Sequence, residues 1–442
     1  MSLNRDRFLK TAAAAAAGAA AGVTRPHIAF GADYAPIGTF PDGTKGDSVF
    51  VGIITPLTGS YSADGVDMQK GYELAFEDLN AGTGVMGKIP SLGGKKGVLG
   101  KKVNYRIADS ETKPDVAVQH ATEFITHDKA IMLSGGVSSA EVIATEKVAQ
   151  QQKVIYMTGA SGSNDTTGKD CQRYAFRSQC DAYMVAKAMA PVLGKNLGHK
   201  RKAIYLVPDY SYGHSLADSM AQFCEQQGWS TVNKVIVPFP STDYSSYLTN
   251  IANTDADTLV NIEFGNDGVA SIKQAQQFGL LKRMTLVVPN ISTYLPDGVG
   301  AETMQGVYGT VEWYPSLESR YPLSKVFISS FVKKHGIRPR WTAHVAYAQV
   351  AIWADAVTRV KTFYPPEIIK TIEAGHPVEL MLGKVFYRAG DHQQVRPVPV
   401  VIGKKPSEMT AKDDFFKIVD LVPGDKVLEP LADTMCKLPA YT

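Results

Sequence analysis

The sequence predicts an α/β fold with parallel central sheets, because apolar strand-like runs and amphipathic helical patterns alternate along most of the chain. The runs 49–54 and 130–133 are apolar without alternation, which is typical of parallel strands that helices cover on both faces. Helical patterns such as 114–127 and 213–227 separate these runs. A chain of 442 residues divides into about two domains, so we expect two lobes.

The composition argues against several kinds of partner. The chain has 46 Lys and Arg against 43 Asp and Glu, and its net charge of +3 gives no electrostatic case for nucleic acid binding. The Gly/Lys-rich stretch 88–102 satisfies the phosphate-loop pattern at no register, and no dinucleotide-binding glycine motif follows a predicted strand. We therefore expect no cofactor.

The N-terminus, 1–32, matches the three-part plan of a secretory signal peptide. Arg5, Arg7 and Lys10 precede the small-residue run 11–23. Asp6 stands where a twin-arginine export motif has its second arginine, so the twin-arginine and the general secretory routes both stay open. We expect an exported protein.

The four cysteines are Cys171, Cys180, Cys224 and Cys436. They show no close pairing and no histidine at zinc spacing, so we expect no metal site. In an oxidising compartment they can form up to two disulfides. We favour a bond between Cys171 and Cys436, which would fasten the far C-terminal tail to the start of the second lobe. The alternative is four unpaired buried thiols.

The segment 51–80 combines a buried strand, a Gly-punctuated loop and an amphipathic helix. Its pattern PLTG-x(5)-G-x(5)-G-x-ELA-x(4)-NAG closely resembles the first unit of the periplasmic solute-binding proteins of ABC transporters, of the branched-chain amino-acid (Leu/Ile/Val-binding) type. The resemblance extends over about 47–400. It implies a type I periplasmic-binding fold, a periplasmic location and a small-molecule ligand that the protein delivers to an ABC permease in the inner membrane.

The resemblance also implies a domain plan with two Rossmann-like lobes. The first lobe would comprise 47–175 and 312–385, and the second would comprise 176–311 and 386–442, including a C-terminal extension. Three crossings of a hinge are expected near 171–182, 307–315 and 382–392.

Ligands of open α/β sheets bind at the carboxyl ends of the strands, and this rule selects three loops of the first lobe. Tyr61 and Asp64 follow the first strand, and Ser138 and Ser139 open a helix after another strand. A helix-starting hydroxyl can help to hold a carboxylate, although Ser139 could instead serve only as a helix cap.

The family's binding residues carry over to the second and third loops of this lobe. The resemblance implies that Ser139, Ala160 and Ser161 grip the ligand's α-carboxylate, with Ser163 nearby. The match between the family's positions and the residues of the third loop could shift by one residue, because relatives usually have a threonine or serine near Gly162.

In the second lobe, a tyrosine-glycine turn at 209–213 resembles the family's turn that closes over the ligand, and Tyr212 is its best candidate. Phe264 follows the next strand in the same way and would contribute an aromatic wall. The alternative is that these aromatic side chains belong to the ordinary core.

The clearest departure from the family is Asn290, which stands where amino-acid binders carry an acidic residue for the ligand's ammonium group. A buried cation without a carboxylate is costly. Either Asp64 or Asp267 substitutes for the missing acid, or the ligand lacks an ammonium. In the second case an aromatic acid or an amide would stack on a set of aromatic side chains, namely Tyr61, Tyr212, Phe264 and Trp313 or Tyr314.

Enzymatic function is not expected. The run 159–163 approaches a G-x-S-x-G nucleophile elbow around Ser161 but has Ser163 in place of the last glycine. Asp391 and His392 lack an assignable nucleophile, and we interpret His392 as a loop residue bonded to a neighbour. Two alternatives to the transport function remain, namely a ligand-sensing regulator of the same fold and an α/β hydrolase that uses Ser161.

Overall fold

The structure is a computed structural model, and it describes residues 34–441, which include nearly all of a compact unit that starts at Ala35. The expected signal peptide, 1–32, lies outside the described residues. Within the described part of the chain, no helix is both long enough and apolar enough to cross a membrane.

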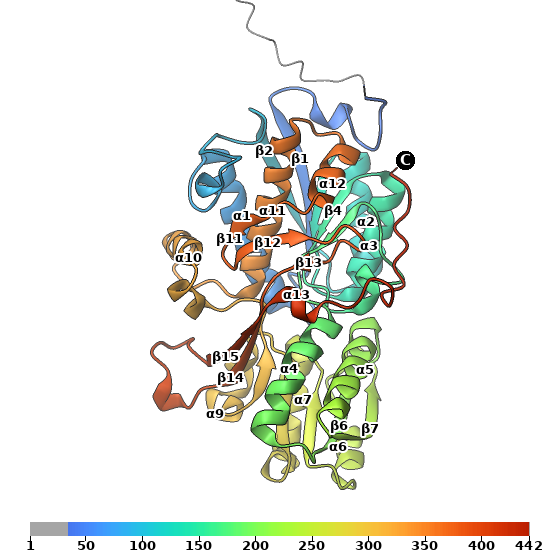
Figure 1. Cartoon of the computed structure of the whole chain (residues 1–442), viewed down its shortest axis with the longest axis vertical. Coiled ribbons are helices and arrows are strands. Elements are labelled where there is room, and N and C mark those ends of the chain that lie inside the picture. The colour runs from blue at the N-terminus through green and yellow to red at the C-terminus, as the bar shows by residue number, and fades with distance from the viewer. Residues whose placement is uncertain (1–33, 442) are drawn as a thin grey trace, which may run out of the picture. The chain divides into compact units, whose positions relative to one another are not determined.

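The first lobe contains a five-stranded parallel sheet with the strand order β2-β1-β3-β4-β5. Its strands are β1 (Ser48–Thr55), β2 (Lys102–Asp109), β3 (Met132–Gly135), β4 (Ile155–Thr158) and β5 (Ala175–Arg177). The helices α2 (Pro114–Thr126) and α3 (Ser139–Gln152) pack against one another and on the sheet. The long helices α1 (Ser62–Ala81) and α11 (Trp341–Val360) pack together on strands of the same sheet (Figure 1).

Helix α1 shows why the sequence folds this way locally. Met68, Tyr72 and Leu79 recur at helical spacing and are buried, and Gly82 ends the helix in the left-handed conformation with a φ of 71°. Gly71 lies where α1 crosses α11, and a Cβ there would lie 2.4 Å from the carbonyl oxygen of Ala343. The glycine therefore permits the close approach of the two helices.

The second lobe contains a seven-stranded sheet with the order β15-β14-β10-β9-β8-β6-β7. Its parallel part comprises β6 (Lys202–Pro208), β7 (Ser230–Val237), β8 (Thr258–Asn261), β9 (Thr285–Asn290) and β10 (Tyr308–Thr310). The strands β14 (Val398–Gly403) and β15 (Phe416–Val422) add to one edge in antiparallel orientation. The expected α/β fold with parallel-rich sheets is thus confirmed.

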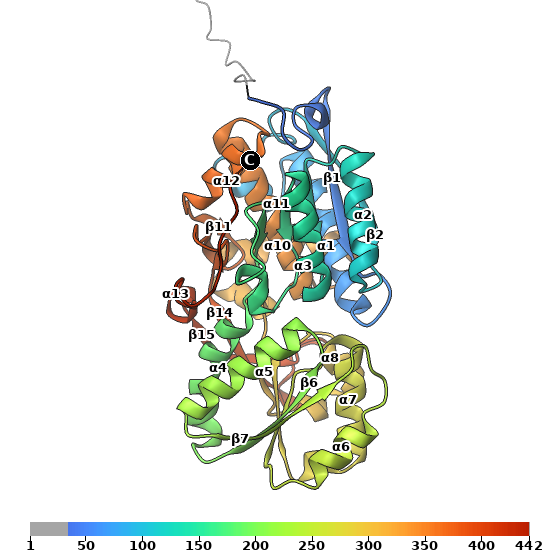
Figure 2. The same ribbon diagram turned by 90° about the vertical axis from the view of Figure 1, so that its right-hand side faces the viewer.

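Helices cover this second sheet on both sides (Figure 2). They are α4 (Ala182–Leu197), α5 (Ser211–Gln226), α6 (Ser245–Ala252), α7 (Gly265–Gln277), α8 (Leu295–Val299) and α9 (Ala301–Met304).

A small antiparallel sheet of β11 (Val378–Leu380), β12 (Gly383–Tyr387) and β13 (Gln394–Val395) packs on the first lobe through α11 and α12 (Pro365–Glu373). Helix α10 (Pro322–His335) also contacts the first lobe, through α1. Because β12 and β13 pair within this small sheet, the third passage between the lobes falls between β13 and β14. That is later in the chain than the expected 382–392.

The chain crosses between the lobes in three segments, which we call passages. Two fully buried arginines form hydrogen bonds and ion pairs that join these three passages. Arg177 is 3.0 Å from the carboxylate of Asp181, and its Nε donates to Oε1 of Gln393 over 2.6 Å. Arg396 is 3.1 Å from the carboxylate of Glu312 and also donates to its backbone carbonyl. Glu312 accepts the backbone N–H of Cys180 over 3.1 Å. Each passage is therefore bonded to the others by a buried charge.

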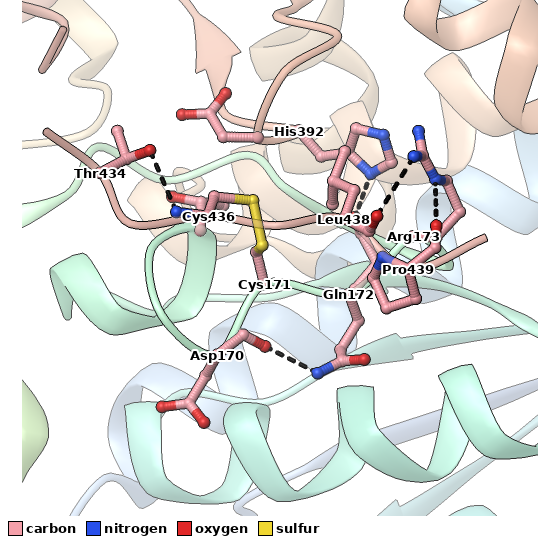
Figure 3. The surroundings of a disulfide bond; sticks show 12 residues. Asp170, Cys171, Gln172, Arg173, His392, Thr434, Cys436, Leu438 and Pro439 are labelled. Carbon is pink, nitrogen blue, oxygen red and sulfur yellow. Dashed lines mark hydrogen bonds between the residues drawn. A yellow bond between two sulfur atoms is a disulfide. The ribbon is translucent and has the colours of Figure 1, made fainter. Parts of the chain in front are cut away.

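The chain after α13 (Gly424–Val427) returns to the first lobe. The disulfide between Cys171 and Cys436 is formed, as we favoured, and Arg173 donates to the carbonyl of Pro439 over 2.8 Å (Figure 3). Cys171 lies four residues before the first residue of β5, an edge strand of the first sheet. The bond therefore fastens the tail to the first lobe, which corrects both the expected anchor at the start of the second lobe and the assignment of all of 386–442 to that lobe.

The expected role of His392 as a bonded loop residue is confirmed, because its two ring nitrogens lie 2.8 Å from the carbonyl of Ala175 and 2.7 Å from the carboxylate of Glu373.

Replacing Arg396 by Met should lower the free energy of unfolding by about 3–5 kcal/mol, because Glu312 would stay buried without its cation. Denaturant titration measures this change. The double variant Arg396→Met/Glu312→Leu should recover most of the loss. A matched control is Lys202→Met, which breaks an exposed ion pair with Asp255 and should change stability little. An equal effect of the two single variants would contradict the importance of the buried pair.

Removing the disulfide with Cys171→Ser/Cys436→Ser should lower the unfolding free energy by about 2–5 kcal/mol, because the bond closes a loop with a sequence separation of 265. Thermal unfolding with and without dithiothreitol provides the control. The reductant should destabilise the wild-type protein and leave the double variant unchanged. A wild-type protein insensitive to complete reduction would show that the tail is held by its other contacts alone.

Candidate functional site

The candidate site is a small cavity at the carboxyl ends of strands from both sheets. Its cavity volume is about 10 Å³, so the two lobes lie close together over it in this arrangement. Its lining comes from both lobes and from one passage between them, and consists of Val137, Ser139, Ala160, Gly162, Gln179, Tyr210, Tyr212, Phe264, Asn290 and Trp341. The structure thus brings together five of the residues selected from the sequence, namely Ser139, Ala160, Tyr212, Phe264 and Asn290.

At the start of α3, two adjacent serines have different roles. Ser138 is the N-cap of a capping box with Glu141, and it does not line the cavity. The Oγ of Ser139 accepts the backbone N–H of Ser163 over 3.1 Å, so the hydroxyl hydrogen of Ser139 stays available as a donor. Of the two, Ser139 is therefore the one that can bond a ligand in the cavity.

The loop after β4 forms the other part of the first-lobe lining. Among the described residues, the backbone N–H groups of Ser161 and Gly162 have no hydrogen-bond acceptor. Buried Arg177 holds this loop by donating to the carbonyls of Ser161 and Ser163. The carbonyl groups are thereby turned toward a cation of the protein, while N–H groups stay free for an anion.

Ser161 and Ser163 themselves do not line the cavity. The Oγ of Ser161 is 2.6 Å from Oγ1 of Thr166, and within the described chain no hydrogen bond joins it to a histidine. Ser163 lies 3.1 Å from the hydroxyl of Ser215 in the second lobe. Ser161 thus lacks the base that a hydrolase nucleophile requires.

The second lobe contributes a largely aromatic wall. Tyr210 and Tyr212 lie at the start of α5, and Phe264 is the N-cap residue of α7. The Tyr212 ring packs closely on Gly162, where a Cβ would lie 2.8 Å from it. Tyr61 stands behind this wall, with its hydroxyl 2.7 Å from that of Tyr210 and its ring edge-on to Phe264.

Sequence reasoning missed Tyr210, Trp341 and Gln179. Tyr210 lies in the same turn as Tyr212, so the turn motif gave a signal for it. Trp341 opens α11, at a helix start that no motif marks as a binding position. Gln179 lies in the first passage between the lobes, where no motif marks a binding residue.

Trp313 and Asp64 are two further predicted site residues that do not line the cavity, in addition to Tyr61, Ser138, Ser161 and Ser163. Trp313 is buried in the hinge, where its indole N–H donates to Ser324 over 3.0 Å and its ring stacks on His344. Its alternative, Tyr314, donates to the carbonyl of Asp413. Asp64 lies inside α1, and its carboxylate accepts the hydroxyl of Ser292 over 2.8 Å.

The lining contains no Asp, Glu, Lys, Arg or His. The nearby acids that could replace the family's acidic residue are already engaged. Burial raises the pKa of Asp64 to about 7, and Asp267 accepts the backbone N–H of Ser241 over 2.8 Å. Burial also raises the pKa of Glu263 to about 8, with the charge of Asp267 adding to the shift. Glu263 is therefore mostly neutral at pH 7.

The arrangement is suited to binding rather than to catalysis. It presents hydroxyl and N–H donors on one side and aromatic rings on the other. Among residues 34–441, no three His, Cys, Asp or Glu side chains gather as metal ligands.

The variant Glu263→Gln should reduce the pH dependence of stability. An acid whose pKa is raised on folding stabilises the protein fully below its unfolded pKa near 4.5, and this contribution is lost as the pH rises through about 8. The unfolding free energy of the wild-type protein should thus fall between pH 5 and 9 more than that of the variant, by roughly 2–4 kcal/mol. Denaturant titrations across this range test it, with exposed Glu302→Gln as control. Parallel pH profiles for wild type and Glu263→Gln would contradict the shifted pKa.

Comparison with known proteins agrees with this architecture. The family model described as periplasmic binding protein matches residues 48–406. The Leu/Ile/Val-binding protein homolog 8 of Brucella abortus (strain 2308) is 27% identical over 338 residues, which cover 73% of this chain and 79% of that protein.

Solved structures show the same fold. A periplasmic binding protein from Burkholderia mallei superposes with a TM-score of 0.80 at 25% identity, covering 88% of this chain and 98% of the other. A solute-binding protein of an ABC transporter from Rhodopseudomonas palustris BisB5, in complex with 3,4-dihydroxy benzoic acid, has a TM-score of 0.73 at 20% identity, with coverages of 86% and 97%. The family and these neighbours are solute-binding proteins rather than enzymes. The chain belongs to the periplasmic binding protein family and has the type I fold of the substrate-binding proteins of ABC transporters.

Proposed function

We propose that this substrate-binding protein is exported, captures a small carboxylate without a free ammonium group, and delivers it to an ABC permease of the inner membrane. The observation that carries the proposal is the uncharged lining of the cavity, which has unused hydrogen-bond donors at its first-lobe end.

A carboxylate fits the first-lobe end of the cavity. The hydroxyl of Ser139 and the N–H group of Gly162 offer two donors close to the N-terminus of the 14-residue helix α3. The positive end of a helix dipole favours an anion, and hydrogen bonds to a charged group are stronger than neutral ones. Burying a carboxylate there needs no cationic side chain.

An ammonium group does not fit the same cavity. It would meet Asn290 in place of an acid, and Asp64 and Asp267 are bonded elsewhere. The rings of Tyr210, Tyr212, Phe264 and Trp341 favour a flat ligand body. An aromatic acid or amide is therefore our preferred ligand class, and the relative from R. palustris BisB5 is an example of this fold with an aromatic acid bound.

Contacts between the lobes support capture by hinge closure. Tyr61 bonds Tyr210 over 2.7 Å, Ser163 lies 3.1 Å from Ser215, and the N–H of Asn266 donates to the carbonyl of Ser60 over 3.0 Å. A ligand held by both lobes would shift the equilibrium toward this closed arrangement, which a permease could then recognise.

The variant Ser139→Ala should weaken binding of a carboxylate about 10- to 100-fold, because it removes one charge-assisted hydrogen bond. The ligand is first chosen by a thermal-shift screen of the mature protein with benzoates, aliphatic carboxylates, their amides and leucine, and affinity is then measured by calorimetry.

The neighbouring variant Ser138→Ala is the matched control. It removes a helix cap outside the cavity, so it should lower stability by about 1 kcal/mol and leave the affinity unchanged. A shift with leucine and with no ammonium-free acid would overturn the proposed ligand class.

A further inference from the structure

We infer that the end of the cavity formed by Tyr212 and Asn290 is a subsite for a neutral hydroxyl or carboxamide group on the ligand, and that Asn290 determines this specificity. The inference rests on the proposed function and adds a second recognised group to the carboxylate.

Three polar groups that line this part of the cavity lack hydrogen-bond partners within the described chain: Oε1 of Gln179, the hydroxyl of Tyr212 and Oδ1 of Asn290. Their residues are 2%, 4% and 6% exposed, so surrounding solvent does not replace the missing partners. Buried polar groups are nearly always bonded in folded proteins. Three unbonded ones on a single small cavity therefore indicate that a ligand bonds them.

The clustering distinguishes these groups from the other unbonded polar atoms of the protein. Nδ1 of His344 lies against Trp313 in the hinge, and Nε1 of Trp353 lies in the core of the first lobe. Neither residue lines the cavity. Within the described chain, ten of the fourteen unbonded buried atoms belong to residues outside the lining, so what distinguishes the cavity is that several of them share one small space.

The chemistry of the three groups defines what they can bind. The Tyr212 hydroxyl can donate or accept, and the Asn290 amide has one donor end and one acceptor end whichever way it is turned. Both residues line the same small cavity. A ligand hydroxyl or carboxamide both donates and accepts, so it can satisfy both residues at once.

Charged groups match this end poorly. An ammonium group only donates, and here it would lack a carboxylate partner. A second carboxylate only accepts, and it would be buried here without a cation, because the lining contains no Lys, Arg or His. The subsite therefore favours a ligand with one carboxylate and one neutral polar group over amino acids, dicarboxylates and unsubstituted acids.

The test compares matched ligands that differ in this one group. The aromatic series is benzoate, 3- and 4-hydroxybenzoate, 4-carbamoylbenzoate and 4-(aminomethyl)benzoate. The aliphatic series is 4-methylpentanoate, 2-hydroxy-4-methylpentanoate and leucine. Calorimetry with the mature wild-type protein should give at least tenfold tighter binding for a hydroxylated or carbamoylated member than for the parent acid, and tenfold weaker binding for the ammonium member.

Variants then assign the preference to Asn290. In Asn290→Leu, the preference for the hydroxyl should fall to within about threefold. In Asn290→Asp, it should reverse toward the ammonium member of the same series. Asn250→Asp adds the same charge at an exposed position of α6 and should leave all affinities unchanged.

The possible results separate this inference from the proposed function. Binding of parent and hydroxylated acids with equal affinity by the wild-type protein would overturn the subsite and leave the carboxylate function intact, whether or not the variants fold. Binding of none of the ammonium-free acids would overturn both. An unchanged preference in a folded Asn290→Leu variant would overturn the assignment to Asn290.

Discussion

The site depends on the two buried arginines of the hinge. Arg177 and Arg396 are almost completely shielded from solvent, and each is paired with a carboxylate, Asp181 or Glu312. An unpaired buried charge is far more costly than an exposed one, so these pairs allow few alternative arrangements. Because they join all three passages between the lobes, they fix where the lobes turn relative to one another. We expect motion between the lobes to preserve these bonds. Small backbone rotations at the ends of the three passages would allow such motion.

The same arginine connects the hinge to the binding loop. Arg177 donates to carbonyls of Ser161 and Ser163 and to the side chain of Gln393 in the third passage. The loop that offers its N–H groups to a ligand is thus held by the residue that organises the hinge. Gln393 also donates to the carbonyl of Gln179, whose side chain lines the cavity. A ligand that bonds Gln179 and the loop would therefore contact two parts of the buried network that also joins the hinge segments.

The sequence could predict what short-range patterns encode. Strand β1 and helix α1 follow from apolar periodicity, and the loop that contains Ser139 follows from the rule that ligands meet the carboxyl ends of parallel strands. Ala160 is implied by the resemblance to the family. Contacts between distant segments could not be predicted in this way. Trp313 lies at a passage between the lobes and could point to the cavity or into the hinge, and only its packing on His344 decides this. The return of the tail to β5 similarly depends on contacts more than 200 residues apart.

The cavity lining carries no charged side chain because the nearby acidic side chains are held outside it. Asp64, Asp267 and Glu263 lie close to the wall in sequence, but burial makes their ionised forms costly, and hydrogen bonds to Ser292 and Ser241 hold the two aspartates in place. Neither aspartate can turn toward a ligand without leaving a buried donor unpaired. On the proposed function, position 290 at the end of β9 would then set the charge that a ligand can carry at this end. Asparagine there keeps the size of an aspartate and removes its charge, so one residue would change the class of ligand without altering the fold around it.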